Sequence, residues 1–301
     1  MSRDDQLIAQ CAAAIAKHAV GMVGETIVPT LGLYNVPSRL PRASTLYTPR
    51  LCAVFQGEKR VEVGTDLFLL KPGSGLLATV DMPVTSSVIR GSRAEPHLAL
   101  TLELDALELA EVMLGVSEDE PAATGLALGV TRLDTALLDS LTRLLGLLDT
   151  PFDIPVMFPL LRREIHYRLV RGPHGEQLRR YAMAGSQQWR IARTTSWLTN
   201  HFAESMRVDE LADTAGMSVT AFHRHFKAIT GLTPLQYRTQ LRLQEARRRL
   251  LAEGRDVGAI AFSVGYESQS QFGREYRRLF GRSPGADAMA MRGELSRADG
   301  R

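Results

Sequence analysis

The last third of the 301-residue chain contains one short pattern twice, and this repeat strongly restricts the folds that the chain can adopt. Ala212 and Gly216 match Ala261 and Gly265 at a spacing of 49 residues. After one extra residue the spacing becomes 50, and the further pairs are Ser218 with Ser268, Phe222 with Phe272, Arg224 with Arg274, Phe226 with Tyr276, Lys227 with Arg277, Gly231 with Gly281 and Pro234 with Pro284. Each copy has the order helix, glycine turn, second helix, glycine stop, proline. This order predicts two helix-turn-helix units rather than two helix pairs of an ordinary bundle.

The first copy shows why each part takes its form. Apolar residues over 208–215 follow the spacing of one helix face, and Gly216 allows a left-handed turn without a Cβ penalty. Ser218 or Thr220 is expected to cap the second helix. Phe222 and Phe226 fall on its buried face, which leaves its basic and polar residues on the exposed faces.

The segment Pro234–Ala252 between the copies predicts a linker helix with an apolar stripe and a basic remainder. The stripe comprises Leu235, Leu241, Leu243, Ala246, Leu250 and Leu251. Such a helix spans about 28 Å at 1.5 Å per residue, and adjacent major-groove faces of DNA lie about 34 Å apart. It therefore has a suitable length to hold two recognition helices in successive grooves.

On these motifs, residues from about 188 to 290 resemble the DNA-binding domain of AraC-type transcriptional regulators. The resemblance implies base contacts at matched positions of the two recognition helices. Those positions are Thr220, His223 and Arg224 in the first unit, and Gln269, Ser270 and Arg274 in the second, with Gln271 close by. Gly273 departs from the family pattern because it has no side chain to offer. Lys227 and Arg277, at matched flanking positions, are expected to contact phosphates.

The segments LYTPRLCAVFQGEKRVEVG and LLATVDMPVTSSVIR resemble the N-terminal domain of one branch of these regulators. That resemblance implies a cupin-like β-barrel followed by helices, used for effector sensing or dimerisation. The residues themselves agree, because 26–104 consists of short β-rich runs separated by turn signals such as Lys71-Pro72-Gly73. The expected fold class is α+β: an N-terminal cupin-like barrel with helices, then an all-α domain.

Over residues 105–184 the apolar residues recur with the spacing of helices rather than strands. Gly185-Ser186 is the expected linker before the DNA-binding domain. We therefore expect a sensing or dimerisation domain over 1–185 and a DNA-binding domain over 186–292. Leu137, Leu141, Leu144 and Leu148 recur with coiled-coil-like spacing. These leucines either form a seam for a homodimer or pack against the barrel.

Charge and cysteine content agree with this division. Residues 186–301 carry 18 basic and 12 acidic side chains, a net +6, whereas the remainder carries 18 and 21, a net −3. A basic domain is suited to phosphate contact. Two cysteines fit a reducing cytoplasm rather than a disulfide framework. The chain has no apolar run long enough for a membrane span, and its N-terminus is expected to form an amphipathic helix.

The barrel segment has a single histidine, His97, and lacks the histidine and glutamate cluster with which cupin enzymes bind metal. We therefore expect neither a metal nor a catalytic cofactor. An apolar interior would instead receive a small effector, with candidate lining residues Cys52, Phe55, Val80, Met82 and His97. Cys52 is either a buried structural thiol or a redox- or electrophile-sensing one.

Taken together, these patterns predict a cytoplasmic, sequence-specific transcriptional regulator controlled by a small molecule. Its expected partners are double-stranded DNA with two adjacent major grooves, an unknown effector, a second copy of the chain and, for an activator, RNA polymerase. The alternatives are a cupin enzyme fused to a DNA-binding module, and a barrel that dimerises without sensing.

Overall fold

The structure is a computed structural model and describes residues 1–114, 125–252 and 256–299. The chain divides into two compact units. One contains Met1–Arg193 with Arg224–Gly231, and the other contains Thr194–His223 with Leu232–Arg301. The division falls within helix α6 (Gln187–His201), so the linker at Gly185-Ser186 and the limits 1–185 and 186–292 stay predictions.

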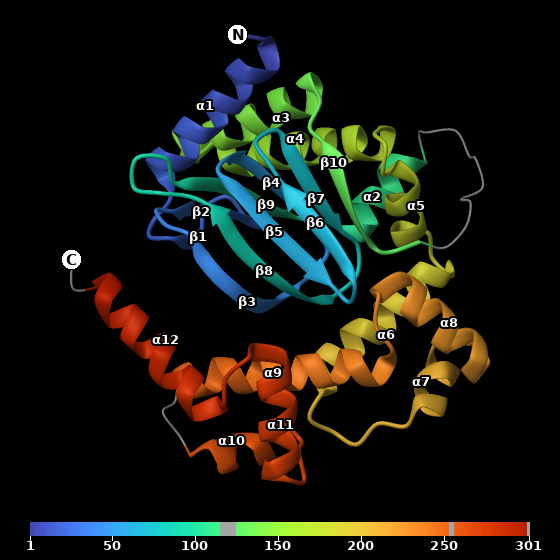
Figure 1. The fold of residues 1–301 in the computed structure, drawn as a ribbon. Coiled ribbons are helices and arrows are strands. Elements are labelled where there is room, and N and C mark those ends of the chain that lie inside the picture. Colours follow the sequence, from blue (N-terminus) through green and yellow to red (C-terminus); the bar gives the residue numbers. More distant parts are fainter. Residues whose placement is uncertain (115–124, 253–255, 300–301) are drawn as a thin grey trace. The chain divides into compact units, whose positions relative to one another are not determined.

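The first unit is built on two antiparallel sheets (Figure 1). The six-stranded sheet has the order β1-β2-β9-β4-β7-β10, and the four-stranded sheet has the order β3-β8-β5-β6. The strands are β1 (Val23–Glu25), β2 (Leu31–Val36), β3 (Leu40–Tyr47), β4 (Arg50–Gln56), β5 (Glu58–Val63), β6 (Asp66–Leu70), β7 (Ser74–Ala78), β8 (Met82–Arg90), β9 (His97–Glu103) and β10 (Leu128–Arg132).

Strands β4 and β5 follow each other in the chain but belong to different sheets, and Gly57 makes the corner between them. Its φ is +75°, which glycine adopts without steric cost. A Cβ at this position would lie 2.5 Å from the Arg90 carbonyl oxygen and 2.9 Å from the His97 Cα. Only glycine therefore fits this corner, which brings the end of β4 close to the start of β9.

Helices cover the six-stranded sheet on one side. They are α1 (Arg3–His18), α2 (Ala106–Met113), α3 (Thr135–Gly146), α4 (Ile154–Arg171) and α5 (Gly175–Ala182), with a short 3₁₀ turn at Pro151–Asp153. The expected amphipathic N-terminal helix is α1, which Ser2 and Asp5 cap reciprocally. Its Leu7, Cys11 and Ile15 lie in one apolar core with the sheet and helices α3 and α4.

This core shows which of the two alternatives for the leucine repeat is correct. Leu137, Leu141, Leu144 and Leu148 are buried, with at most 9% of any side chain exposed, and all four belong to the core shared with α1 and the sheet. Packing against the β-structure is therefore the correct alternative, and a dimer seam formed by these leucines is wrong.

Two parts of the strand prediction need correction. The helical region expected over 105–184 contains strand β10, which pairs with β7 from Leu128↔Ala78 to Arg132↔Ser74. The β-structure also extends beyond 26–104, because β1 begins at Val23. No individual helix in the described residues has the length and apolar character to cross a bilayer; the bent pair Thr135–Gly146 and Pro151–Arg171 meets those two criteria jointly.

The C-terminal helices are α6, α7 (Val208–Thr214), α8 (Val219–Thr230), α9 (Pro234–Ala252), α10 (Val257–Ser263), α11 (Gln269–Phe280) and α12 (Pro284–Asp299). The pairs α7–α8 and α10–α11 are the two expected helix-turn-helix units, and α9 has the limits predicted for the linker helix. A β-rich N-terminal domain followed by an all-α region confirms the α+β fold class.

Candidate nucleic-acid interface and effector pocket

The repeat seen in the sequence is also a repeat of backbone hydrogen bonds. The N–H groups of Gly216 and Met217 donate to the carbonyls of Asp213 and Ala212, and those of Gly265 and Tyr266 donate to Phe262 and Ala261 in the same way. All four distances are 2.9–3.0 Å. Gly216 and Gly265 both have positive φ, at +62° and +90°. The extra residue of the second unit is therefore Glu267, directly after the glycine turn.

Matched serines then begin the two second helices. The hydroxyl of Ser218 accepts from the Ala221 N–H at 3.3 Å, and that of Ser268 accepts from the Gln271 N–H at 3.3 Å. Of the two caps predicted for α8, Ser218 is the one that forms, while Thr220 remains exposed. Each cap satisfies a helix N–H that would otherwise lack an intrahelical partner.

Aromatic residues fix the inner faces of these helices. Phe222 and Phe226 in α8 are fully buried, as are Phe272 and Tyr276 in α11. In the second unit Phe272 packs edge-on between Tyr266 and Tyr276, with ring centroids 5.3 and 5.4 Å apart. These rings determine which residues face outward, because side chains three and four positions apart share a face of a helix.

The sequence-predicted contact residues are all exposed. Thr220, His223, Arg224 and Lys227 have the spacing of one face of α8. On α11 the equivalent face carries Ser270, Gly273, Arg274 and Arg277, and Gln269 and Gln271 lie next to it. Two of these residues have partners within their own unit. Arg224 lies 3.2 Å from the His225 Nε2, and Gln271 donates to the Glu275 carboxylate at 3.1 Å.

Several arginines of α9 hold the domain together. Arg242 donates to the carbonyls of Phe202, Ala203 and Glu204, which closes the end of α6. Arg247 forms an ion pair with the buried Asp287 at 2.8 Å, and the Tyr276 hydroxyl donates to the same carboxylate at 2.9 Å. These buried contacts occupy Arg242 and Arg247 within the protein.

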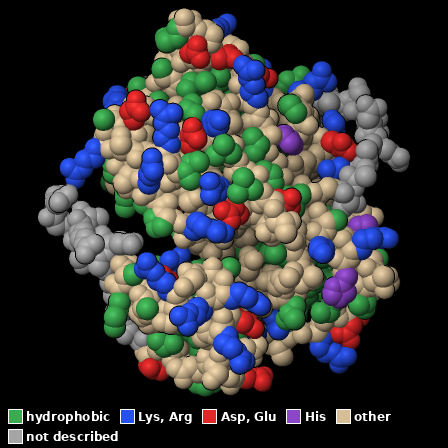
Figure 2. Space-filling view, in the orientation of Figure 1, with side chains coloured by type: hydrophobic (Ala, Val, Ile, Leu, Met, Phe, Trp, Pro, Cys, Tyr) green, Lys and Arg blue, Asp and Glu red, His purple; other side chains and the backbone are tan. Residues whose placement is uncertain are grey.

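The next two arginines of α9 turn outward. Arg248 and Arg249 both pair with Glu245, and Arg248 is the more exposed of the two. The three consecutive arginines Arg247, Arg248 and Arg249 therefore do not share one partner, because Arg247 pairs with Asp287 and the other two pair with Glu245. Lys and Arg side chains also recur over the surface of the C-terminal helices in Figure 2, in agreement with the basic charge of this part of the sequence.

The apolar stripe predicted for the linker helix α9 includes one residue that is not covered, since Leu235 is 57% exposed.

In the β-rich unit the five predicted lining residues are all buried, and Phe55 faces the opposite side of the sheet from Cys52. Phe55 belongs to the core between the six-stranded sheet and the helices, with Leu51 and Ala53. Because neighbouring residues of a strand face opposite ways, Cys52 faces the other sheet. Met82 is opposite Tyr47 in the β3–β8 ladder. Burial raises the pKa of the Cys52 thiol, which disfavours the reactive thiolate and supports the structural role.

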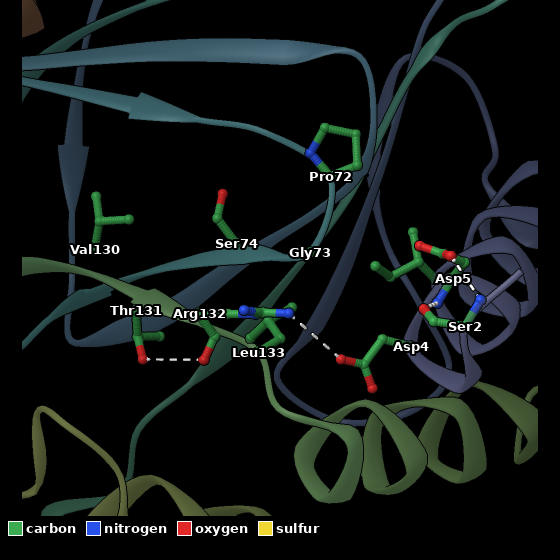
Figure 3. A pocket seen from close by; sticks show the side chains of 11 residues that line it. Ser2, Asp4, Asp5, Pro72, Gly73, Ser74, Val130, Thr131, Arg132 and Leu133 are labelled. Carbon is green, nitrogen blue, oxygen red and sulfur yellow. Dashed lines mark hydrogen bonds and ion pairs between the residues drawn. The ribbon is translucent and has the colours of Figure 1, made fainter.

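Two pockets lie in the β-rich unit, among the described residues. The first is lined by α1, β7 and β10, and Figure 3 shows its acidic residues already engaged. Asp4 pairs with Arg132 at 3.7 Å, and Asp5 caps α1. The second has a volume of about 580 Å³ and is lined by β1, β2, β4 and β9. Its polar residues include Glu25, Tyr34, Arg50, Thr101 and Glu103. None of the five predicted residues lines either pocket.

Next to the second pocket is a polar group that the sequence analysis missed. Lys59 Nζ lies 5.4 Å from the ring centre of Tyr34 and 5.6 Å from that of Tyr47. The available signal was a lysine in strand alternation with Val61 and Val63, which marks an inward-facing position. No group of three or more His, Cys, Asp and Glu side chains in the described part of the chain is placed to hold a metal.

Comparison with known proteins agrees with this architecture. Residues 27–177, about half of the chain, match the family model described as the AraC-type transcriptional regulator N-terminus, and residues 211–288 match a helix-turn-helix domain model. The transcriptional activator RhaS of Escherichia fergusonii is 40% identical over 95 residues, which cover 32% of this chain and 34% of RhaS. RhaS of Pectobacterium carotovorum is 33% identical over 101 residues, or 34% and 36% of the two chains. The match therefore spans about a third of each relative.

Among solved structures, ToxT of Vibrio cholerae O395 bound to a naphthalenyl-butenoic acid covers 85% of this chain and 98% of its own, with a TM-score of 0.56 and 8% identity. At this identity the likeness concerns the fold, and it extends over both the β-rich and the helical parts. The family model, the helix-turn-helix match and the duplicated unit agree, and the chain belongs to the AraC-type transcriptional regulators.

Proposed function

We propose that the protein is a sequence-specific DNA-binding transcriptional regulator whose recognition helices α8 and α11 read one operator. The observation that carries this proposal is the duplicated unit. Two helix-turn-helices share their turn hydrogen bonds and serine caps, and each presents an outward face of polar and basic residues. In such units the second helix enters the major groove. The 19-residue helix α9 between them has a length of about 28 Å, which favours two adjacent grooves.

Base readout is assigned to the exposed faces of α8 and α11. Arginine binds the O6 and N7 of guanine through two hydrogen bonds, and glutamine binds adenine in a similar way. Arg224 and Arg274, with Gln269, are therefore the residues proposed to discriminate between bases. Thr220, His223, Ser270 and Gln271 are proposed to support that readout, and Lys227 and Arg277 to contact phosphates.

A small effector is proposed to bind in the β-rich domain, over 1–185, and to change how the domain over 186–292 binds DNA. The pocket of about 580 Å³ supports this assignment, because small-molecule sites commonly have this size. A ToxT structure that covers 86% of this chain, with a TM-score of 0.53 and 8% identity, contains an unsaturated fatty acid. An enzyme is less favoured, since the family consists of transcriptional regulators.

A homodimer is proposed to form through α4 rather than through the α3 leucines. Phe152, in the 3₁₀ turn before this helix, and Val156 and Leu160 within it follow each other at four-residue steps and are 98%, 68% and 59% exposed. Exposed apolar stripes of this kind are typical of interaction sites. RNA polymerase is the further partner proposed for an activator, and the cytoplasm is the proposed location because both DNA and polymerase are reached there.

Genome-wide mapping of binding sites, followed by titration of the enriched sequence, tests the proposal. The expected operator has two short half-sites about one helical turn apart, and binding at least about 10³-fold tighter than to random DNA. Equal affinity for both DNAs would contradict sequence-specific regulation. A single half-site would contradict the use of two grooves.

A further inference from the structure

Lys59 faces the interior of the β-rich domain. It alternates along β5 with Val61 and Val63, which are 0% and 2% exposed, whereas Glu62 on the opposite face pairs with Arg42. Its partners in the neighbouring strands are Val88 and Leu70, both buried. Residues directly opposite each other in a ladder share a face, so the lysine stands in an apolar surface. A charge in such a place is costly unless an opposite charge or a set of hydrogen bonds compensates it.

The interior supplies only partial compensation for this charge. Lys59 Nζ lies near the rings of Tyr34 and Tyr47, a cation–π arrangement across the two sheets. Among the described residues no Asp or Glu forms an ion pair with it. The Tyr47 hydroxyl is buried next to Lys59, which interacts with it, and Tyr47 is only 5% exposed.

This group adjoins a pocket through Tyr34, although neither Lys59 nor Tyr47 lines that pocket. Tyr34, which contacts Lys59 through its ring, also lines the pocket of about 580 Å³. Arg50 lines the same pocket, and its guanidinium carbon lies 5.9 Å from the ring centre of Tyr47. Two cations therefore flank one tyrosine, and Lys59 itself is only partly buried. Two carboxylates, Glu25 and Glu103, also line the pocket, and Glu103 pairs with Arg50 at 3.9 Å. Thr101 adds a hydroxyl to the pocket wall.

We propose that this pocket binds an organic carboxylate, with the acid group between Lys59 and the Tyr47 hydroxyl and the carbon skeleton in the pocket beside Tyr34. A carboxylate has two acceptor oxygens, which suits one ammonium and one neighbouring hydroxyl. A phosphate offers more acceptors than these donors would satisfy. This inference rests on the proposed effector function and specifies the chemical class of its ligand.

The test measures binding to the full-length protein without DNA. Sodium butyrate, octanoate and benzoate are titrated by calorimetry and thermal shift, with octanamide and inorganic phosphate as comparison ligands. We expect at least one carboxylate to bind and to raise the melting temperature. The tightest-binding one should bind at least about tenfold more weakly to Lys59→Met, a loss of about 1.4 kcal/mol. Lys71→Met, which removes an exposed lysine, should bind it like the natural chain.

A purely structural role of Lys59 gives a different pattern. In that case Lys59→Met lowers the melting temperature of the ligand-free protein, whereas removal of an unpaired charge from a ligand site leaves it unchanged or raised. Tyr47→Phe keeps the ring and removes only the hydroxyl, so it should fold normally and weaken carboxylate binding. The proposal is overturned if no carboxylate binds, if octanamide binds as tightly as octanoate, or if both variants bind like the natural chain.

Operator titration in the presence of the bound carboxylate then separates the proposed carboxylate site from the proposed effector function. A carboxylate that binds through Lys59 but leaves operator affinity unchanged upholds the site and contradicts its role as an effector. An operator response to a neutral metabolite, in a protein that ignores every carboxylate, upholds effector control and overturns the carboxylate site.

Discussion

Arg224 and Arg274 occupy equivalent exposed positions, 50 residues apart, on the two recognition helices. A guanine contact made by either should be lost on truncation to alanine. We expect Arg224→Ala and Arg274→Ala each to cost about 1–3 kcal/mol on the operator and to relax preference at one base pair. Fluorescence titration on the operator and on single-base variants measures both effects. Equal losses on operator and random DNA would show that these arginines contact phosphates.

Lys227 and Arg277 provide the matched comparison, since they lie one position beyond the aromatic residues Phe226 and Tyr276. Their replacement by glutamine should weaken binding to every sequence alike. It should also lower the slope of log affinity against log salt by about one unit. An unchanged slope would remove them from the set of phosphate contacts.

Two glycines of the second unit should respond to alanine in opposite directions. Gly265 has a φ of +90°, and a Cβ there would overlap the Ala203 carbonyl oxygen and lie 2.7 Å from Arg242 Nη2. Gly273 is helical with no atom within 4 Å of that position. Gly265→Ala should therefore cost about 2 kcal/mol or more, whereas Gly273→Ala should stabilise by about 0.5–1 kcal/mol. Urea unfolding gives both values, and a stable Gly265→Ala protein would contradict the close packing of the turn.

At the scale of elements, the sequence predicts the helical part better than the β-rich part. Local signals determine α9 and the helix-turn-helices, because glycine turns, serine caps and apolar spacing all act within one element. Strand β10 depends on pairing with β7, about 50 residues earlier, and its Leu128–Arg132 segment is too short to show a period. The lining of the pocket was missed for the same reason, since Tyr34 and Lys59 meet only when two sheets face each other.

Helices α3 and α4 make the contrast between core and surface testable. Leu141 of α3 is fully buried in the core, whereas Leu160 of α4 is 59% exposed. Leu141→Ala should destabilise the protein by about 2–5 kcal/mol, because it leaves a cavity. Leu160→Asp should leave the melting temperature of the protomer nearly unchanged and shift a dimer towards monomer in sedimentation experiments. A Leu160→Asp protein that keeps its dimer would place the interface elsewhere.

At the scale of the whole molecule, two buried histidines make stability depend on pH. Burial lowers the pKa of both His97 and His166 to about 4, with Lys59 and Arg162 respectively as additional causes. His166 Nδ1 also lies 3.0 Å from Glu108. As pH falls below 6.5, these histidines are protonated in the unfolded chain before they are protonated in the folded protein. The free energy of unfolding therefore decreases between pH 6.5 and 4. At a shift of this size the limit is about 3 kcal/mol for each histidine.

Asp81 acts in the opposite direction. Burial raises its pKa to about 6, so the folded protein binds a proton more readily than the unfolded chain and gains stability as pH falls towards 3.8. Urea unfolding should therefore show a net decrease in the free energy of unfolding between pH 7 and 5. Asp81→Asn should make that decrease larger, because it removes the opposing contribution of Asp81. Constant stability over this range would mean that the histidines are charged in the folded protein.

For an effector to change DNA binding, a structural element must connect the β-rich unit with the helical unit. Helix α6 is such an element, because it is continuous from the first compact unit into the second. Its first turn is attached to the β-rich unit by Gln188, which is 1% exposed. The Gln188 amide donates to the Thr79 hydroxyl at 2.6 Å and to the Gln177 carbonyl at 3.3 Å. A ligand changes DNA affinity only if it favours one of two states of the protein, and this buried attachment is placed to differ between them.

Gln188→Leu should therefore keep carboxylate binding and ligand-free operator binding while reducing the coupling between them. The ligand-induced change in operator affinity, typically about 5- to 150-fold in coupled systems, should fall close to one. Gln187→Leu makes the same substitution at the exposed neighbouring position and should leave the coupling intact. Operator titrations with and without the tightest-binding carboxylate give the ratio of the two operator affinities for each variant. A Gln188→Leu protein with the full response would show that the signal reaches α8 and α11 by a route other than the start of α6.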